Sequence, residues 1–258
     1  MEGGWWLSFC ALGLPLLVAG GYAVVTGLIL SPEQLPAFHA ETGPVETVTA
    51  VVMLATAGAA ALLALKLRRN AAAPRRWQVW YLLIAAGALF VFMEEISYGQ
   101  HWFGWTSPAY FQEHNKQREL NLHNLYGDAL SSSMRKAVNV GLPLGVLVLP
   151  LVFMRRPNTY RPGHWTWYAL PRLDLAVWVL LAALLSPIRK LGGFTGEGNW
   201  AGSLSELKEL MWACALLMYV AVMWRRLLGA GRRAVAGPDD AAAGVASEHA
   251  SREGRGAA

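Results

Sequence analysis

Charged residues are scarce in this chain. Only 15% of its 258 residues are Asp, Glu, Lys or Arg, whereas 55% are hydrophobic and twelve are tryptophan. About a quarter of the residues in an ordinary soluble domain are charged. The composition therefore excludes a typical soluble globular protein and favours an integral membrane protein.

Cysteines and catalytic motifs are also scarce. The two cysteines, Cys10 and Cys214, lie in apolar stretches, where we interpret them as apolar fillers rather than a disulfide or a metal pair. The chain contains no HExxH, GxSxG or CxxC motif and no glycine-rich phosphate loop, so none of the enzyme classes that these motifs mark is indicated. It has no internal repeat of the kind found in many transporters.

Long hydrophobic runs dominate what is present. A helix of roughly 20 residues crosses a bilayer, and the alternating pattern of a barrel strand is absent, so we predict an all-α membrane protein. The first run has no basic start and is too long for a signal peptide, and we expect it to remain as a span. Six spans are predicted, at residues 5–30, 45–66, 77–97, 137–154, 171–188 and 204–224.

The basic residues predict the orientation. Eleven Lys and Arg residues fall on one side of the predicted spans, in the loops after the second and fourth spans and directly after the sixth, and seven fall on the other side. Because basic loops stay inside, we expect a bacterial cytoplasmic (inner) membrane protein with both termini cytoplasmic. A basic rim facing anionic headgroups accounts for the net charge of +5, so no nucleic-acid partner is expected.

One loop stands out by its length. The outer loop at 98–136 connects the third and fourth spans, and Thr106-Ser107-Pro108 resembles a helix start. We predict an interfacial or re-entrant helix from there to about Leu125. Residues 1–228 then form a six-helix transmembrane domain, and 229–258, with almost no large apolar residue, a disordered cytoplasmic tail.

Acidic residues gather on the outer side. Eleven of the seventeen Asp and Glu residues fall there, although acidic residues have little influence on topology. Glu46 opens the second span, Glu94 and Glu95 end the third, and Glu206 and Glu209 open the sixth. Three helices therefore present carboxylates at one predicted level.

Helical spacing adds two polar rows to these acids. If the third span continues as a helix, Glu94, Ser97 and His101 share one face. The predicted loop helix would likewise align Gln112, Asn115, Glu119 and His123. Solvated helix ends and ion pairs are the structural alternative for each of these acids.

Converging carboxylates that leave water must share protons, pair with a base or bind a cation. Glutamate with histidine suits zinc, iron or manganese, and carboxylate with amide oxygens suits calcium, so we expect a divalent metal. The predicted catalytic residues are Glu94, Glu95 and His123. The predicted metal ligands are Glu46, Glu94, Glu119, His123 and Glu209. The predicted polar support consists of Ser97, Gln100, His101, Asn121, Asn124 and Glu206.

Two segments carry a resemblance. EEISYGQ at 94–100 and ELNLHN at 119–124 resemble an uncharacterised family of bacterial multi-pass membrane proteins that reads E-E-x-S-[WY]-G-Q and E-[IL]-N-L-H-N. ETGPVETVTA at 41–50 and ELKEL at 206–210 resemble its further acidic segments. The resemblance implies the same multi-pass fold and the same polar positions, but no activity. Alkaline ceramidases are not a match, because the sixth span has no histidine.

The leading functional hypothesis is a membrane enzyme that acts on a lipid headgroup or a lipid-linked substrate with a divalent metal. The first alternative is a proton- or cation-coupled transporter that uses the acids as a relay. The second is a non-catalytic subunit that docks a membrane protein partner through its acidic outer face.

Overall fold

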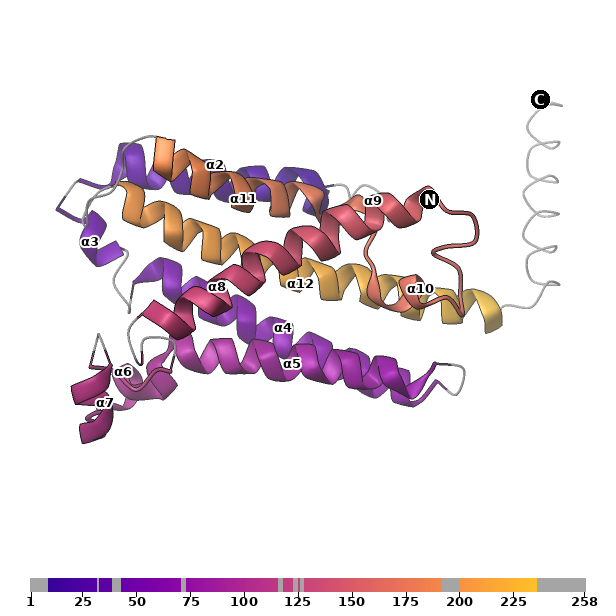
Figure 1. Ribbon diagram of the computed structural model, residues 1–258, viewed down its shortest axis with the longest axis horizontal. Helices are drawn as coiled ribbons and strands as arrows, with labels where there is room; N and C mark the ends of the chain where they lie inside the picture. The colour runs from indigo at the N-terminus through magenta and orange to yellow at the C-terminus, as the bar shows by residue number, and fades with distance from the viewer. Residues whose placement is uncertain are drawn as a thin grey trace, which may run out of the picture. The chain divides into compact units, whose positions relative to one another are not determined.

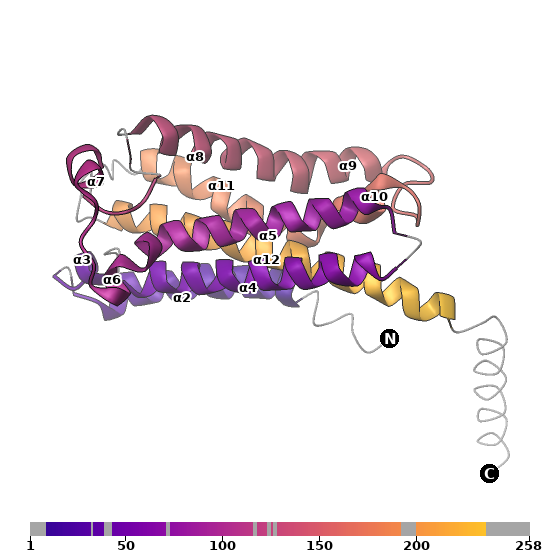
Figure 2. The same ribbon diagram turned by 90° about the horizontal axis from the view of Figure 1, so that it is seen from below.

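The computed structural model of this chain describes residues 9–31, 33–38, 43–70, 73–115, 118–122, 125, 128–191 and 200–235. Within these ranges every regular element is helical, apart from one isolated antiparallel bridge between Asn115 and Leu125. The all-α prediction is confirmed (Figures 1 and 2).

Within the described ranges, six helical segments are long and apolar enough to cross a membrane, as the sequence predicts. The first, Phe9–Ile29, consists of α2 (Leu14–Val24) between the π-helical segments η1 (Phe9–Gly13) and η2 (Val25–Ile29). The second and third are α4 (Pro44–Arg68) and α5 (Arg75–Glu95). The fourth, Lys136–Met154, joins the end of α8 (Asp128–Pro143), η4 (Leu144–Val148) and α9 (Leu149–Met154). The fifth, Trp165–Leu185, contains α10 (Trp165–Ala169), η5 (Leu173–Leu175) and most of α11 (Ala176–Leu191), and the sixth, Leu204–Leu228, lies within α12 (Trp200–Val235).

Local sequence explains where α4 begins and ends. Gly43 precedes the helix in an extended conformation, and Pro44 occupies the first turn, where its missing N–H costs nothing. Glu46 lies in the same turn, and Lys66 and Arg68 lie in the last one. These charges complement the helix dipole at both ends.

A small-residue core joins three spans at one end of the molecule. Ala50, Met53 and Ala57 of α4 pack with Ala88 and Phe92 of α5 and with Ala213 of α12. The alanines allow the backbones to approach closely, which is how membrane helices gain packing energy without a hydrophobic driving force. We call these six residues the packed cluster.

Hydrogen bonds between aromatic side chains and the backbone join the opposite ends of these spans to α10. The Tyr81 hydroxyl donates to the Tyr168 carbonyl at 2.7 Å, and the Tyr219 hydroxyl donates to the Ala169 carbonyl at 2.8 Å. The Trp80 indole N–H donates to Tyr219 Oη at 3.0 Å. The carbonyls at the end of α10 therefore find donors from two other helices.

Many large apolar side chains point outward from the spans, among them Leu28, Leu83 and Leu184, which are 81%, 62% and 52% exposed. A bilayer would cover such side chains. The six apolar helices and this exposed apolar surface together are those of a membrane protein.

One condition and one prediction about helix continuity fail. The condition for a shared face of Glu94, Ser97 and His101 is not met, because α5 ends at Glu95 and Ser97, Tyr98 and Gly99 all have positive φ. The loop helix does not reach Leu125: α7 covers only Ala109–His114, after which the chain is extended at Asn115 and left-handed at Arg118.

Other boundaries differ less. The fifth span begins at Trp165 rather than at residue 171, because α10 precedes α11. The predicted tail from residue 229 falls partly on α12, and its part from residue 236 lies outside the described residues.

Candidate functional site

Acids from three spans lie one helical turn beyond the packed cluster. Glu46 precedes Ala50 by four residues on α4, Glu209 precedes Ala213 by four on α12, and Glu95 follows Phe92 by three on α5. At a rise of about 1.5 Å per residue, each carboxylate-bearing residue starts roughly 4.5 to 6 Å beyond the cluster along its helix. The helices run in alternating directions, so these displacements all point to the same end.

The acids of α5 and α12 lie close enough to repel one another electrostatically. The Glu95 carboxylate interacts with those of Glu209 and Glu206, and with that of its neighbour Glu94. Glu95, Glu206 and Glu209 are each half-buried. We call these three residues the acid cluster. Lys208, also half-buried, brings one positive charge to the same turn of α12.

Glu94 has a different environment from Glu95. Its side chain is only 4% exposed, and its Oε2 accepts the backbone N–H of Leu122 at 2.8 Å. It also interacts with the Tyr98 hydroxyl: burial, with a hydrogen bond to Glu94 and the charge of Glu94, raises the pKa of Tyr98 to about 12. Glu94 thus holds the loop that follows α5.

A buried polar network closes this loop over the end of α5. The Ser97 hydroxyl donates to Glu119 Oε2 at 2.6 Å. Asn121 Nδ2 donates to Ser97 Oγ and to Glu119 Oε2, each at 3.4 Å. Asn115 Nδ2 donates to the backbone and side-chain oxygens of Asn121 at 2.7 and 2.8 Å. All four side chains are buried, so the network is a closed structural unit rather than an open pocket.

Gln100 forms a second junction within the loop. Its Oε1 accepts the Ser107 hydroxyl at 2.7 Å and the Leu120 N–H at 2.9 Å, and Gln112 Nε2 donates to the Ser107 carbonyl at 2.6 Å. Two distant stretches of the loop are therefore joined through one amide. Polar groups that folding removes from water therefore find hydrogen-bond partners inside the loop.

The predicted site residues thus divide into two groups. Glu94, Ser97, Gln100, Glu119 and Asn121 hold the loop. The half-buried Glu95, Glu206 and Glu209 form the acid cluster.

The remaining predicted residues belong to neither group. Glu46 reaches the level of the acid cluster by its spacing on α4. His123 and Asn124 lie outside the described residues, as does the side chain of His101. Within the described part of the chain, no group of three or more His, Cys, Asp or Glu residues is arranged to hold a metal ion. The predicted metal set, which includes His123, stays a prediction.

Two loop residues, Tyr98 and Ser107, are not among the predicted site residues. Ser107 looks like a helix cap in the sequence, but its hydroxyl donates to Gln100 instead. Tyr98 matches the [WY] position of the family motif, but its left-handed backbone at φ 52° and its contact with Glu94 have no signal in the sequence.

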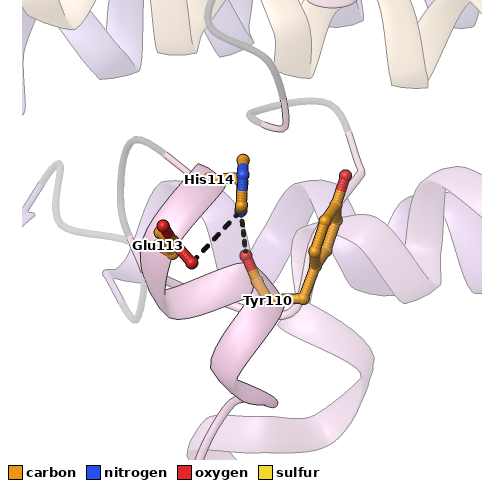
Figure 3. Close-up of polar contacts among 3 residues, drawn as sticks. All are labelled: Tyr110, Glu113 and His114. Carbon is orange, nitrogen blue, oxygen red and sulfur yellow. Dashed lines mark hydrogen bonds and ion pairs between the residues drawn. The ribbon is translucent and has the colours of Figure 1, made fainter.

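A further polar contact lies on α7 (Figure 3). His114 Nδ1 is 3.0 Å from the Tyr110 carbonyl and 4.0 Å from Glu113 Oε2, and the Tyr110 and His114 rings stack at 4.4 Å. A carbonyl oxygen only accepts, so Nδ1 carries the proton in this contact. The contact is local to one short, exposed helix and stabilises that helix.

Comparison with known proteins adds no relative: no family model, no curated protein and no solved structure matches this chain.

Proposed function

We propose that this chain is a membrane enzyme that acts on a lipid headgroup or a lipid-linked substrate at the outer face of a bacterial cytoplasmic membrane. The observation that supports the proposal is the acid cluster, in which half-buried carboxylates from two spans interact at one end of the helices. Span ends lie at the level of the headgroups. The acid cluster can therefore contact a lipid headgroup that stays in the headgroup layer of the bilayer.

Glu95 is the best candidate for the chemistry. It is half-buried, whereas Glu94 and Ser97 are 4% and 3% exposed and are already hydrogen-bonded to the loop. A carboxylate in such a position serves as a general base or binds a cationic group. Glu206 and Glu209 would orient the cationic group that Glu95 binds, or would hold the substrate. Glu94, Ser97 and Glu119 are positioning residues in this proposal.

The divalent cation is a separate part of the proposal and depends on His123. The residues that would hold an ion are the predicted ligands Glu46, Glu94, Glu119, His123 and Glu209, of which Glu94 and Glu119 also bond to Leu122 and Ser97 of the loop. Such an ion would act as a Lewis acid towards a phosphoryl or carbonyl oxygen.

The orientation belongs to the same proposal. Basic residues lie at the opposite ends of α4 and α5, where Lys66, Arg68, Arg75 and Arg76 flank the connection between them. With that end cytoplasmic, the acid cluster faces outward and both termini face the cytoplasm. Between its acidic and its basic end, none of α4, α5 and α12 carries an Asp, Glu, Lys, Arg or His side chain, so no relay of acidic or basic side chains runs along them.

The test uses isosteric neutral variants. Glu95→Gln and Glu209→Gln would be expressed in cells that lack the chain, beside wild type and Glu113→Gln. Glu113 is a matched control because its side chain is 79% exposed on α7, outside the acid cluster. We expect the lipid profile, measured by mass spectrometry at equal protein level, to match the deletion strain for the two cluster variants and wild type for the control. The proposed enzymatic function would be refuted if the cluster variants restored the wild-type lipid profile, or if the deletion left the lipid profile unchanged.

Metal analysis tests the cation separately. We expect a divalent metal to co-purify with wild type and to be reduced in His123→Ala. Purified wild type without such a metal would remove the cation from the proposal and leave the role of the acids standing.

A further inference from the structure

An exposed aromatic surface follows the end of α5. The short helix α6 (Gln100–Phe103) and the next turn carry Trp102, Phe103 and Trp105, which are 63%, 71% and 48% exposed. We call these three residues the aromatic surface. Large aromatic side chains rarely stay in water in such a group, so the exposure requires an explanation.

This surface is held in a fixed orientation. Gly99 and Gly104, with φ of 83° and 66°, flank α6 in left-handed conformations. The Phe103 ring lies so close to Gly99 that a Cβ there would be 2.9 Å from it. The Phe103 ring also contacts Trp105, with centroids 5.1 Å apart, so the side chains are ordered against one another.

The aromatic surface lies against the end of a span. The Trp102 ring contacts Phe92 of α5, with centroids 6.4 Å apart. On the same half of α5, Leu89 and Phe90 are 46% and 36% exposed. Both the end of this span and α6 therefore expose large apolar side chains.

The chemistry of the segment fits lipid better than water or a charged partner. Residues 96–111 contain no Asp, Glu, Lys or Arg, although they lie outside the spans. The Gln100 oxygen accepts bonds from within the loop, and the Gly104 N–H donates to the Gln100 carbonyl at 2.9 Å. Internal satisfaction of polar groups is what a segment in contact with the bilayer requires.

We infer that the aromatic surface inserts into the interfacial layer of the bilayer, at the boundary between headgroups and acyl chains. Tryptophan favours this layer because its ring is apolar and its N–H finds water or headgroup oxygens. The loop that covers the end of α5 is thus anchored in lipid on one side, while its buried network anchors it to the helix on the other.

Site-specific labelling tests the insertion in the full chain. In a Cys10→Ala, Cys214→Ala background, Phe103→Cys would be labelled with an environment-sensitive fluorophore and reconstituted in vesicles. Glu113→Cys, on the exposed α7, serves as the aqueous reference, and Leu83→Cys, which is 62% exposed on α5, serves as the lipid reference. Lipids brominated near the top of the acyl chain report lipid contact, and iodide reports water contact.

We expect the probe at 103 to be quenched severalfold more by brominated lipid, and severalfold less by iodide, than the probe at 113. Quenching by iodide as strong as at 113 would overturn the inference. Protection from both quenchers would also overturn it, because a protein or a second copy of the chain would then cover the surface. Trp102→Cys repeats the measurement at a second position if the label at 103 disturbs the fold.

Discussion

The bond between Ser97 and Glu119 should control how tightly the loop is closed. Ser97→Ala removes a 2.6 Å donor from a carboxylate that is 8% exposed, and leaves that oxygen with the Asn121 amide at 3.4 Å. A hydrogen bond to a charged group contributes about 1.5 to 3 kcal/mol. The substitution should reduce the free energy of local loop opening by this amount.

Hydrogen exchange measures that opening directly. The Leu120 and Leu122 N–H groups donate to Gln100 and Glu94 only while the loop is closed. At RT of about 0.6 kcal/mol, the expected loss accelerates their exchange roughly 10- to 150-fold. Exchange should stay unchanged within α4, where the backbone bonds do not depend on the loop.

A hydroxyl deletion elsewhere provides the control. Thr56 is fully buried on α4, and its Oγ1 donates to the Val52 carbonyl at 2.8 Å within the same helix. Thr56→Ala should therefore leave the exchange of Leu120 and Leu122 as in wild type. Equal exchange in Ser97→Ala and wild type would show that the network does not hold the loop and would refute this account.

Four further predictions concern Tyr98, Gly99 and Tyr219. Glu94→Gln should lower the pKa of Tyr98 from about 12, but not to 10.0, because burial is the larger cause; ultraviolet titration measures it. Since an unfolded tyrosine ionises first, the wild type should lose stability as pH rises from about 10 towards 12. Gly99→Ala should destabilise by at least about 1 to 2 kcal/mol, because φ is 83° and the added Cβ meets a ring, whereas Gly87→Ala in α5, with nothing within 4 Å, should be neutral or stabilising in thermal unfolding. Tyr219→Phe should cost about 1 to 3 kcal/mol in a denaturing-detergent titration, because it removes two hydrogen bonds; an unchanged midpoint would contradict the role of this hydroxyl.

Hydropathy predicts the spans well because one physical requirement decides them. Each helix must supply enough apolar length for a bilayer, and every span that the sequence predicts is present. Glu95 is the last residue of α5, and Glu209 lies in the first part of the span at Leu204–Leu228, as the sequence places them.

The loop is not predictable in this way. Its path depends on left-handed residues at 97 and 98, where neither Ser nor Tyr favours positive φ, so no local signal marks the break after α5. Contacts with Glu119 and Glu94 outweigh that local cost. The row from Gln112 to His123 fails for a related reason: Asn115 bonds to Asn121, which requires the chain to turn back between them.

The alanine-rich contact between α4 and α5 lowers the entropic cost of joining that pair of spans. Ala57, Ala60 and Ala88 are buried and have no side-chain rotamers to lose when they pack, so the two backbones come close without immobilising a mobile side chain. Glu46 and Glu95 belong to this pair of spans, whereas Glu206 and Glu209 belong to α12, which meets the pair through Ala213.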